Sequence, residues 1–391
     1  MVRNSQGYRV EAFASSETMP VATARLASGG RMDHMSSPAT HPLRDGRTAD
    51  SALIAALRGQ RPERTPVWFM RQAGRSLPEY RALRVGTAML DACLDPELAS
   101  EITLQPVRRH SVDAAVFFSD IVIPLRLAGV PVEIVAGRGP VLDSPIRSAS
   151  DILRLRPIDP DALAPIREGV ARTVAELGDT PLVGFAGAPF TLASYLVEGG
   201  PSKDQLRARS LMVSDPSAWA QLLNWCADVS GAFLRAQVEA GASAVQLFDS
   251  WVGSLSRSDY QRRVAPHSRR TLSALRGLDM PIIHFGVGSG DVLDLMAGIG
   301  ADAVGVDWRI PLDEASRRLG GDVVVQGNID PALLTAPWEV LRAHVLDVME
   351  RGRAAPAHVV NLGHGVPPET DPDVLTRIVN LVHEASVGVP A

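Results

Sequence analysis

Cysteine is nearly absent from this sequence, which has only two cysteines, Cys93 and Cys226, in 391 residues. Two isolated cysteines cannot build a disulfide framework, and these two lack the close spacing of zinc-binding pairs. The sequence therefore predicts no metal site, and the lack of disulfides favours a reducing, cytoplasmic setting.

Long apolar runs and clusters of basic residues are missing too. The apolar stretch at residues 121–135 is interrupted by Arg126 and Glu133, and no run approaches the ~20 residues of a membrane-spanning helix. The formal net charge is −5, without a polybasic run. We therefore expect neither nucleic acid nor an anionic membrane as a partner. The composition, 46% hydrophobic and 21% charged, is typical of a globular protein of enzyme size.

The first 48 residues differ in composition from the rest of the chain. They are rich in serine, glycine, threonine and arginine, and they show no sustained hydrophobic periodicity. They lack the apolar core of a secretion signal, and Glu11 and Glu17 argue against an organelle-targeting peptide. We expect a disordered extension over residues 1–48 and a single catalytic domain over residues 49–391.

After residue 50 the chain alternates short apolar runs with longer amphipathic stretches. The runs are too uniformly apolar for half-exposed strands and are typical of parallel strands buried on both faces. Eight strand and helix units favour a single-domain α/β fold, a (β/α)8 barrel of the TIM type, although a doubly wound sheet also fits. The predicted strands are residues 66–70, 114–118, 182–186, 244–248, 281–285, 303–307, 322–326 and 358–361.

Several helices have clear start signals. Asp95, Asp215 and Asp371 each stand directly before a proline. Aspartate caps a helix N-terminus well, and proline fits the first helical position, so a helix is predicted to begin after each aspartate. Residues 131–141 are interpreted as a hairpin inserted after the second strand.

The first predicted strand ends in two arginines that flank a small turn, Arg71-Gln72-Ala73-Gly74-Arg75. The planar guanidinium group matches a carboxylate or phosphate, and Gly74 lets the backbone approach a ligand closely. A surface loop with two solvated arginines is the alternative. Because the active sites of such barrels lie at the carboxyl ends of the strands, we expect a pocket for an anionic ligand here.

Other polar residues follow the ends of predicted strands. Asp120 lies between two apolar segments, where a carboxylate needs a cation or hydrogen-bond donors, supplied either by a ligand or by a structural salt bridge to Arg126. His364 stands between two glycines after the last strand, and Tyr195 precedes a glycine pair typical of a mobile loop. His284 has a weaker context and is predicted to be structural.

Together these residues resemble the uroporphyrinogen decarboxylase family. The resemblance extends over nearly all of residues 50–391 and does not include the N-terminal extension. It implies a distorted (β/α)8 barrel, usually a homodimer, without a metal or prosthetic group. It also implies removal of carbon dioxide from the four acetate side chains of uroporphyrinogen III, which gives coproporphyrinogen III in tetrapyrrole biosynthesis. The matching segments are residues 66–81, 104–120, 184–203, 246–253, 304–307, 326–331 and 361–368.

The resemblance further implies roles for individual residues. Arg71 and Arg75 would bind the carboxylates of the substrate and Asp120 its pyrrole N–H groups, which makes these three the expected catalytic residues. Ser76 and Met89 differ from the tyrosine and phenylalanine that are common in the family, and neither difference affects an ionic residue. The expected substrate-binding residues are Arg71, Gln72, Ala73, Gly74, Arg75, Asp120, Tyr195, Ser250 and His364.

The implied chemistry needs no cofactor, because a pyrrole ring protonated on carbon can accept the electrons that decarboxylation releases. Two alternatives stay open. A zinc-dependent methyltransferase on a related barrel would need thiolate and imidazole ligands, and neither Cys93 nor Cys226 lies at a predicted strand end. A tetrapyrrole carrier without catalytic activity would keep the same pocket and release no carbon dioxide.

Overall fold

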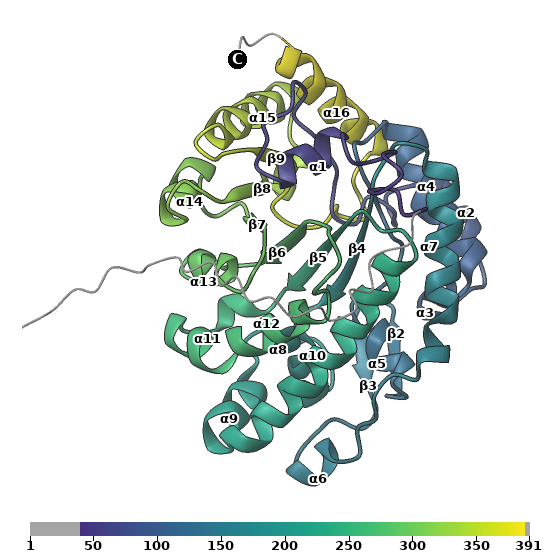
Figure 1. Cartoon of the computed structure of the whole chain (residues 1–391), viewed down its shortest axis with the longest axis vertical. Helices are drawn as coiled ribbons and strands as arrows, with labels where there is room; N and C mark the ends of the chain where they lie inside the picture. The colour runs from purple at the N-terminus through teal and green to yellow at the C-terminus, as the bar shows by residue number, and fades with distance from the viewer. Residues whose placement is uncertain (1–39, 388–391) are drawn as a thin grey trace, which may run out of the picture. The chain divides into compact units, whose positions relative to one another are not determined.

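A curled sheet of parallel strands forms the centre of the molecule, and helices lie around its outer face (Figure 1). The structure, a computed structural model, describes residues 40–387. Seven strands pair in parallel, and their spatial order is their order along the chain. The strands are β1 (Ala115–Val116), β4 (Leu182–Gly187), β5 (Ala244–Asp249), β6 (Ile282–Gly286), β7 (Ala303–Gly305), β8 (Val324–Ile329) and β9 (His358–Leu362).

The segment at residues 66–70 closes this sheet between β9 and β1 without forming a regular strand. Val67 makes a single parallel bridge with Val360 of β9. On its other side, the carbonyl of Val67 accepts a hydrogen bond from the N–H of Asp113 at 2.9 Å, just ahead of β1. The predicted strand at 66–70 is thus reduced to one bridged residue, while the TIM-type barrel is confirmed.

Side chains replace the strand hydrogen bonds that this segment lacks. The N–H of Phe69 donates to Oε1 of Gln72 at 2.9 Å, and the N–H of Met70 donates to Oδ1 of Asn361 at 3.0 Å. Both amide side chains are fully buried. Because a buried N–H without a partner is costly, these amides allow the chain to leave the sheet early and turn towards Arg71.

The other seven predicted strands are confirmed with shifts of a few residues at their ends. Every residue of β4, β6, β8 and β9 is buried, as the uniformly apolar pattern predicts for parallel strands covered on both faces. The expected hairpin is present as the antiparallel strands β2 (Val132–Val135) and β3 (Gly139–Leu142). It reaches the loop after helix α8 (Pro189–Glu198), because Leu142 N donates to Gly199 O at 3.1 Å.

The predicted helix starts are confirmed as well. Oδ1 of Asp95 accepts hydrogen bonds from the first turn of α4 (Pro96–His110), and Asp215 caps α10 (Pro216–Glu239) in the same way. Helix α16 (Pro372–Val387) begins after Asp371. The other helices are α1 (Ala52–Leu57), α2 (Pro78–Leu83), α3 (Met89–Leu94), α5 (Ile123–Leu127), α6 (Ala149–Ile152), α7 (Ala164–Leu177), α9 (Leu206–Ser214), α11 (Arg257–Arg263), α12 (Ala265–Ser273), α13 (Leu293–Ala297), α14 (Leu312–Arg318) and α15 (Trp338–Gly352), with short 3-10 turns η1 (Pro160–Leu163), η2 (Val252–Ser254) and η3 (Pro331–Thr335).

The end of the expected N-terminal extension packs against the barrel. A ring nitrogen of buried His41 lies 3.0 Å from the carbonyl oxygen of Val238, and the hydroxyls of Thr48 and Ser243 are 2.9 Å apart. The rest of that extension, residues 1–39, lies outside the described residues. Among residues 40–387, no helix is both long enough and apolar enough to cross a membrane.

Candidate active site

The loops after the first and last barrel segments meet at Arg71. Its backbone adopts a left-handed conformation with φ 63°, which a non-glycine residue rarely takes up without a functional or structural constraint. The side chain runs directly over Gly365, where an added Cβ would lie 2.5 Å from Cδ of Arg71. Any larger residue at position 365 would therefore force the side chain of Arg71 to shift from its present path.

Neither Arg71 nor Arg75 forms an ion pair among the described residues, and both are exposed. Nearby Arg109, in contrast, is neutralised by Glu79 at 2.7 Å. Two uncompensated guanidinium groups on one short loop at the strand ends attract an anionic ligand. Because both side chains are exposed, the pocket for an anionic ligand stays a prediction beside the alternative of a loop with two solvated arginines.

Gln72, Ala73 and Gly74 complete the loop between the two arginines. The side chain of Gln72 is buried, and besides binding Phe69 it donates from Nε2 to the carbonyl of Ala114 at 2.9 Å. Both ends of its amide are thus used inside the protein, so Gln72 supports the loop with its side chain. Ala73 and Gly74 are half-buried beside it.

Asp120 follows β1 and is half-buried. Its Oδ1 accepts a hydrogen bond from the N–H of Val122 at 3.0 Å. Burial raises the pKa of this carboxyl group, while the Val122 hydrogen bond and the positive charge of Arg71 act in the opposite direction. The alternative partner, Arg126, instead binds Asp91 at 2.6 Å. The structural salt bridge considered for Asp120 is therefore not formed.

Tyr195 of α8 is electrostatically coupled to the same charges. Burial raises its pKa to about 12, and the negative charge of Asp120 adds to this effect, while Arg71 opposes it. Its phenol therefore stays protonated and can donate a hydrogen bond. The ring packs edge to face against Trp251, with centroids 5.8 Å apart. Ser250, half-buried, immediately precedes Trp251 after the end of β5.

His364 follows β9 and is half-buried. Burial and the charge of Arg71 lower its pKa, so the imidazole is neutral at pH 7 and can exchange hydrogen bonds with a ligand without adding charge. Its ring lies edge-on to Trp308 at a centroid separation of 6.4 Å.

Arg309 is a further arginine near this mouth that was not among the predicted site residues. Its guanidinium stacks over Trp308 at 4.0 Å from the ring centroid and binds the carboxylate of Asp307. Half of the side chain is exposed, and its charge also lowers the pKa of His364. The signal for Arg309 was its place after the sixth predicted strand, since all strand ends of a barrel open on one face.

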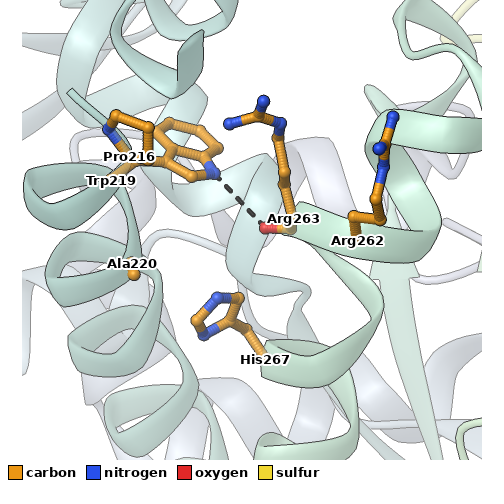
Figure 2. Close-up of a pocket in the computed structure, with 6 residues that line it drawn as sticks. All are labelled: Pro216, Trp219, Ala220, Arg262, Arg263 and His267. Carbon is orange, nitrogen blue, oxygen red and sulfur yellow. Dashed lines mark hydrogen bonds between the residues drawn. The ribbon is translucent and has the colours of Figure 1, made fainter. Parts of the chain in front are cut away.

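A separate cavity of about 300 Å³ lies between α10 and the helices α11 and α12 (Figure 2). Figure 2 shows Trp219 donating from its indole N–H to the carbonyl of Arg263, while the Arg262 side chain points away from the indole. None of the predicted site residues lines this cavity. The candidate site is therefore the mouth of the barrel and not this groove between outer helices. The cavity is lined by Pro216, Trp219, Ala220, Arg262, Arg263 and His267.

The described residues offer no ligand set for zinc. Within residues 40–387, no three side chains of histidine, cysteine, aspartate or glutamate come together in a way that could hold a metal ion. Cys93 and Cys226 are buried in α3 and α10, and burial raises the pKa of both thiols, which disfavours the thiolate that zinc needs. This donor set does not fit the zinc-dependent methyltransferase.

A parallel α/β barrel with charged and polar side chains in the loops after its strands belongs to a class of fold whose enzymes carry their active sites at the strand ends. The family model for uroporphyrinogen decarboxylase matches residues 48–385. The chain belongs to the uroporphyrinogen decarboxylase family.

Individual relatives agree with this assignment. The chain is 67% identical over 342 residues to uroporphyrinogen decarboxylase from Arthrobacter sp. (strain FB24), covering 88% of this chain and 99% of that protein. It is 64% identical over 365 residues to the protein of the same name from Leifsonia xyli subsp. xyli, covering 88% and 97%. Among solved structures, a methyltransferase from Methanosarcina mazei has the same fold, with a TM-score of 0.73, 20% identity and coverage of 86% and 99%.

Proposed function

We propose that the mouth of this barrel carries out the reaction of its family. The chain decarboxylates uroporphyrinogen: it removes carbon dioxide from the four acetate side chains of uroporphyrinogen III and gives coproporphyrinogen III. Identities of 67% and 64% to proteins named for this activity, over nearly their whole length, support the reaction. The observation that supports the site is the grouping of Arg71, Asp120 and Tyr195, because the charges of Arg71 and Asp120 act on each other and on the neutral phenol of Tyr195.

Arg71 and Arg75 bind carboxylates of the substrate in this proposal. A guanidinium group presents two parallel N–H donors to a carboxylate, and neither of these two is occupied by an acidic side chain of the described protein. Arg309 adds a third guanidinium near the same mouth, which suits a substrate that carries acidic groups around its whole rim. Ala73 and Gly74 keep the loop narrow, and Gln72 holds it in place.

Asp120 binds the pyrrole N–H groups at the centre of the macrocycle. Only one of its oxygens accepts a hydrogen bond from the backbone, which leaves the other for N–H donors of a ligand. Such donors favour the ionised carboxyl group and act against the effect of burial on its pKa. An ionised Asp120 in a half-buried site stabilises a positive charge on the bound pyrrole.

The proposed chemistry uses the pyrrole itself as the acceptor of electrons. A proton added to a ring carbon makes the ring cationic, and the carbon–carbon bond to the carboxylate then breaks to release carbon dioxide. The electron pair of that bond neutralises the ring. A proton taken up at the side-chain carbon forms the methyl group, and the ring carbon gives up its added proton. Asp120 stabilises the cationic ring through both steps, and no metal or prosthetic group is required.

Tyr195, Ser250 and His364 supply neutral polar contacts to the substrate. Ser250 and His364 follow strands, Tyr195 lies in the helix after β4, and each is at least partly buried. We assign the activity to the proposed catalytic domain, residues 49–391, acting as a homodimer in the cytoplasm. The homodimer rests on the resemblance described above.

An anaerobic assay with reduced uroporphyrinogen tests the proposal, followed by chromatography of the oxidised products. The wild-type chain should yield coproporphyrinogen, whereas a carrier without activity would return the substrate unchanged. Asp120→Ala should abolish turnover while the circular dichroism spectrum stays that of the wild type. A rate close to that of the wild type in this variant would remove Asp120 from the mechanism.

A further inference from the structure

Two fully buried titratable groups face each other between β5 and β6, which neighbour each other in the sheet (Figure 1). Asp249 is the last residue of β5, and His284 lies in β6. Both side chains are 0% exposed, and Nε2 of His284 lies 3.9 Å from Oδ2 of Asp249. Neither of these two atoms forms a hydrogen bond with the described protein. A pair of unsatisfied polar atoms at this depth calls for an explanation.

The other oxygen of Asp249 links two elements of the candidate site. Oδ1 accepts a hydrogen bond from the hydroxyl of Thr191 at 2.9 Å, and that hydroxyl oxygen in turn accepts from the N–H of Trp251 at 3.4 Å. Thr191 lies one helical turn before Tyr195 on α8, so both project from one face of the helix. The ring of Tyr195 packs against Trp251, so α8 and the segment after β5 are connected both through Thr191 and through Tyr195.

The groups around Asp249 leave its negative charge without compensation. Thr191 faces it from α8, His284 from β6, and the buried phenol of Tyr260 lies close enough on α11 to sense its charge. No arginine forms an ion pair with Asp249 among the described residues. Burial raises the pKa of Asp249 to about 7 and lowers that of His284 to about 4. In this order of pKa values the pair keeps one proton, which Asp249 holds, between pH 4 and 7.

The neutral ring of His284 can accept a hydrogen bond from a protonated Asp249. Nδ1 of His284 lies 3.4 Å from the carbonyl oxygen of Met296, so the proton of a neutral ring belongs on Nδ1. Nε2 is then an acceptor that faces Oδ2. A carboxylic acid donates to such an acceptor, directly after a small approach or through one water, whereas a carboxylate repels its lone pair.

We propose that Asp249 is a positioning residue of this active site, whose carboxylic acid holds α8 against the segment after β5 and thereby fixes Tyr195 and Ser250. The proposal rests on the proposed function, because these two side chains are fixed to contact the substrate. Loss of the proton would keep the bond from Thr191 but leave an uncompensated charge in the core, facing the lone pair on Nε2 of His284. Repulsion between these two atoms would displace the end of β5 and the side chains that follow it. Catalysis should therefore weaken as the pH rises through about 7.

Two substitutions separate positioning from mere packing. Asp249→Asn copies the protonated acid, since its oxygen can accept from Thr191 and its NH2 group can donate to His284. At pH 6 it should keep kcat/KM within about 3-fold of the wild type, and it should lose the decline of kcat/KM above pH 7. Asp249→Ala breaks the link and should lower kcat/KM about 10- to 100-fold by misplacing Tyr195 and Ser250.

A matched control uses a carboxylate at the opposite end of the barrel. Asp302 accepts from the N–H of Ile282 at the start of β6, far along the strand from its carboxyl end, and Asp302→Asn should leave the pH profile unchanged. Thr191→Ser keeps the hydroxyl and should behave like the wild type, whereas Thr191→Val should resemble Asp249→Ala. The proposal would be overturned if kcat/KM of Asp249→Asn declined above pH 7 as in the wild type. Wild-type values of kcat and KM in Asp249→Ala would overturn it as well.

A measurement without substrate keeps this test independent of the proposed function. The folded state holds the proton of Asp249 between about pH 4 and pH 7, where the unfolded chain has released it. The thermal midpoint of the wild type should therefore fall relative to that of Asp249→Asn as the pH rises through this window. If the thermal midpoints of the two proteins changed in parallel with pH, Asp249 would not be protonated, even in a chain that decarboxylates uroporphyrinogen. A chain without activity could still show the expected difference between the two midpoints.

Discussion

At the scale of single residues, small side chains shape the mouth of the barrel as much as charged ones do. Arg71 is held in a left-handed backbone conformation, and its stem crosses Gly365 with no room for a Cβ. The loop after β9 therefore determines where a guanidinium group of the first loop stands. A residue without a side chain in this sense helps to determine the position of a charged group.

Gly365→Ala should impair catalysis by displacing Arg71. The new methyl group would lie 2.5 Å from Cδ and 2.8 Å from Cγ of Arg71, so the guanidinium must move by about 1 Å. A displacement of that size at a reacting site lowers kcat/KM by about 100-fold. Steady-state kinetics with uroporphyrinogen checks this result. Gly298→Ala is the matched control, because residue 298 has φ −63° and lies at the end of α13; equal rates in both variants would contradict the prediction.

The residue scale also shows where prediction from sequence ends. The charged groups Arg71 and Asp120 and their place after strands were predictable, because parallel strands bring their carboxyl ends to one face. The inward orientation of the Gln72 amide was not predictable, because the sequence around a glutamine between two arginines does not indicate where its side chain points. The contact of Asp249 with His284 was equally hidden, because it depends on the register between two consecutive strands, which the sequence does not print.

At the scale of elements, the least regular part of the barrel is the one that carries the arginines. Residues 66–70 have one bridged residue, and the N–H groups of Phe69 and Met70 donate to side-chain amides instead of to a neighbouring strand. A regular strand would have continued beside β9 and placed Arg71 next to that strand instead of in a loop. The sequence predicted a strand there because Val67, Trp68 and Phe69 are apolar, and it contains no local signal that amides would replace the ladder.

Gln72→Ala should destabilise this closure. The substitution leaves the N–H of Phe69 and the carbonyl of Ala114 buried without partners, which costs about 2–4 kcal/mol of unfolding free energy. Urea denaturation followed by circular dichroism measures this loss. Gln221→Ala serves as the control, since Gln221 is exposed on α10 and should change stability by less than about 0.5 kcal/mol. An equal effect of the two substitutions would show that the Gln72 amide does not hold the segment.

At the scale of the whole molecule, the alternation of strands and helices was enough to predict the barrel. The seven paired strands, the inserted hairpin and three capped helices all follow local patterns of two kinds, apolar runs and an aspartate before a proline. Burial of titratable groups is a different matter, because it arises only when many segments enclose one residue. The pH dependence of stability therefore follows from the fold and not from the composition.

Three buried histidines predict a loss of stability in mild acid. Burial lowers the pKa of His110, His284 and His358 to about 4, below the 6.5 of a free imidazole. Such a group contributes its full stabilisation above pH 6.5 and loses it as the pH falls towards 4, because the unfolded chain takes up the proton first. Each shift corresponds to roughly 3 kcal/mol. The raised pKa of Asp249 stabilises the folded state as the pH falls over part of this range, which offsets the loss from about one histidine.

The unfolding free energy should consequently fall between pH 6.5 and pH 4, as urea denaturation at a series of pH values would show. His110→Gln keeps a hydrogen-bonding group next to Thr376, whose hydroxyl lies 2.7 Å from Nδ1 of His110, and removes one titration. The decline with acid should therefore be shallower in this variant by about one proton, and the two curves should separate as the pH falls towards 4. A wild-type free energy that stays constant across this window would mean that these imidazoles accept protons without leaving the folded core.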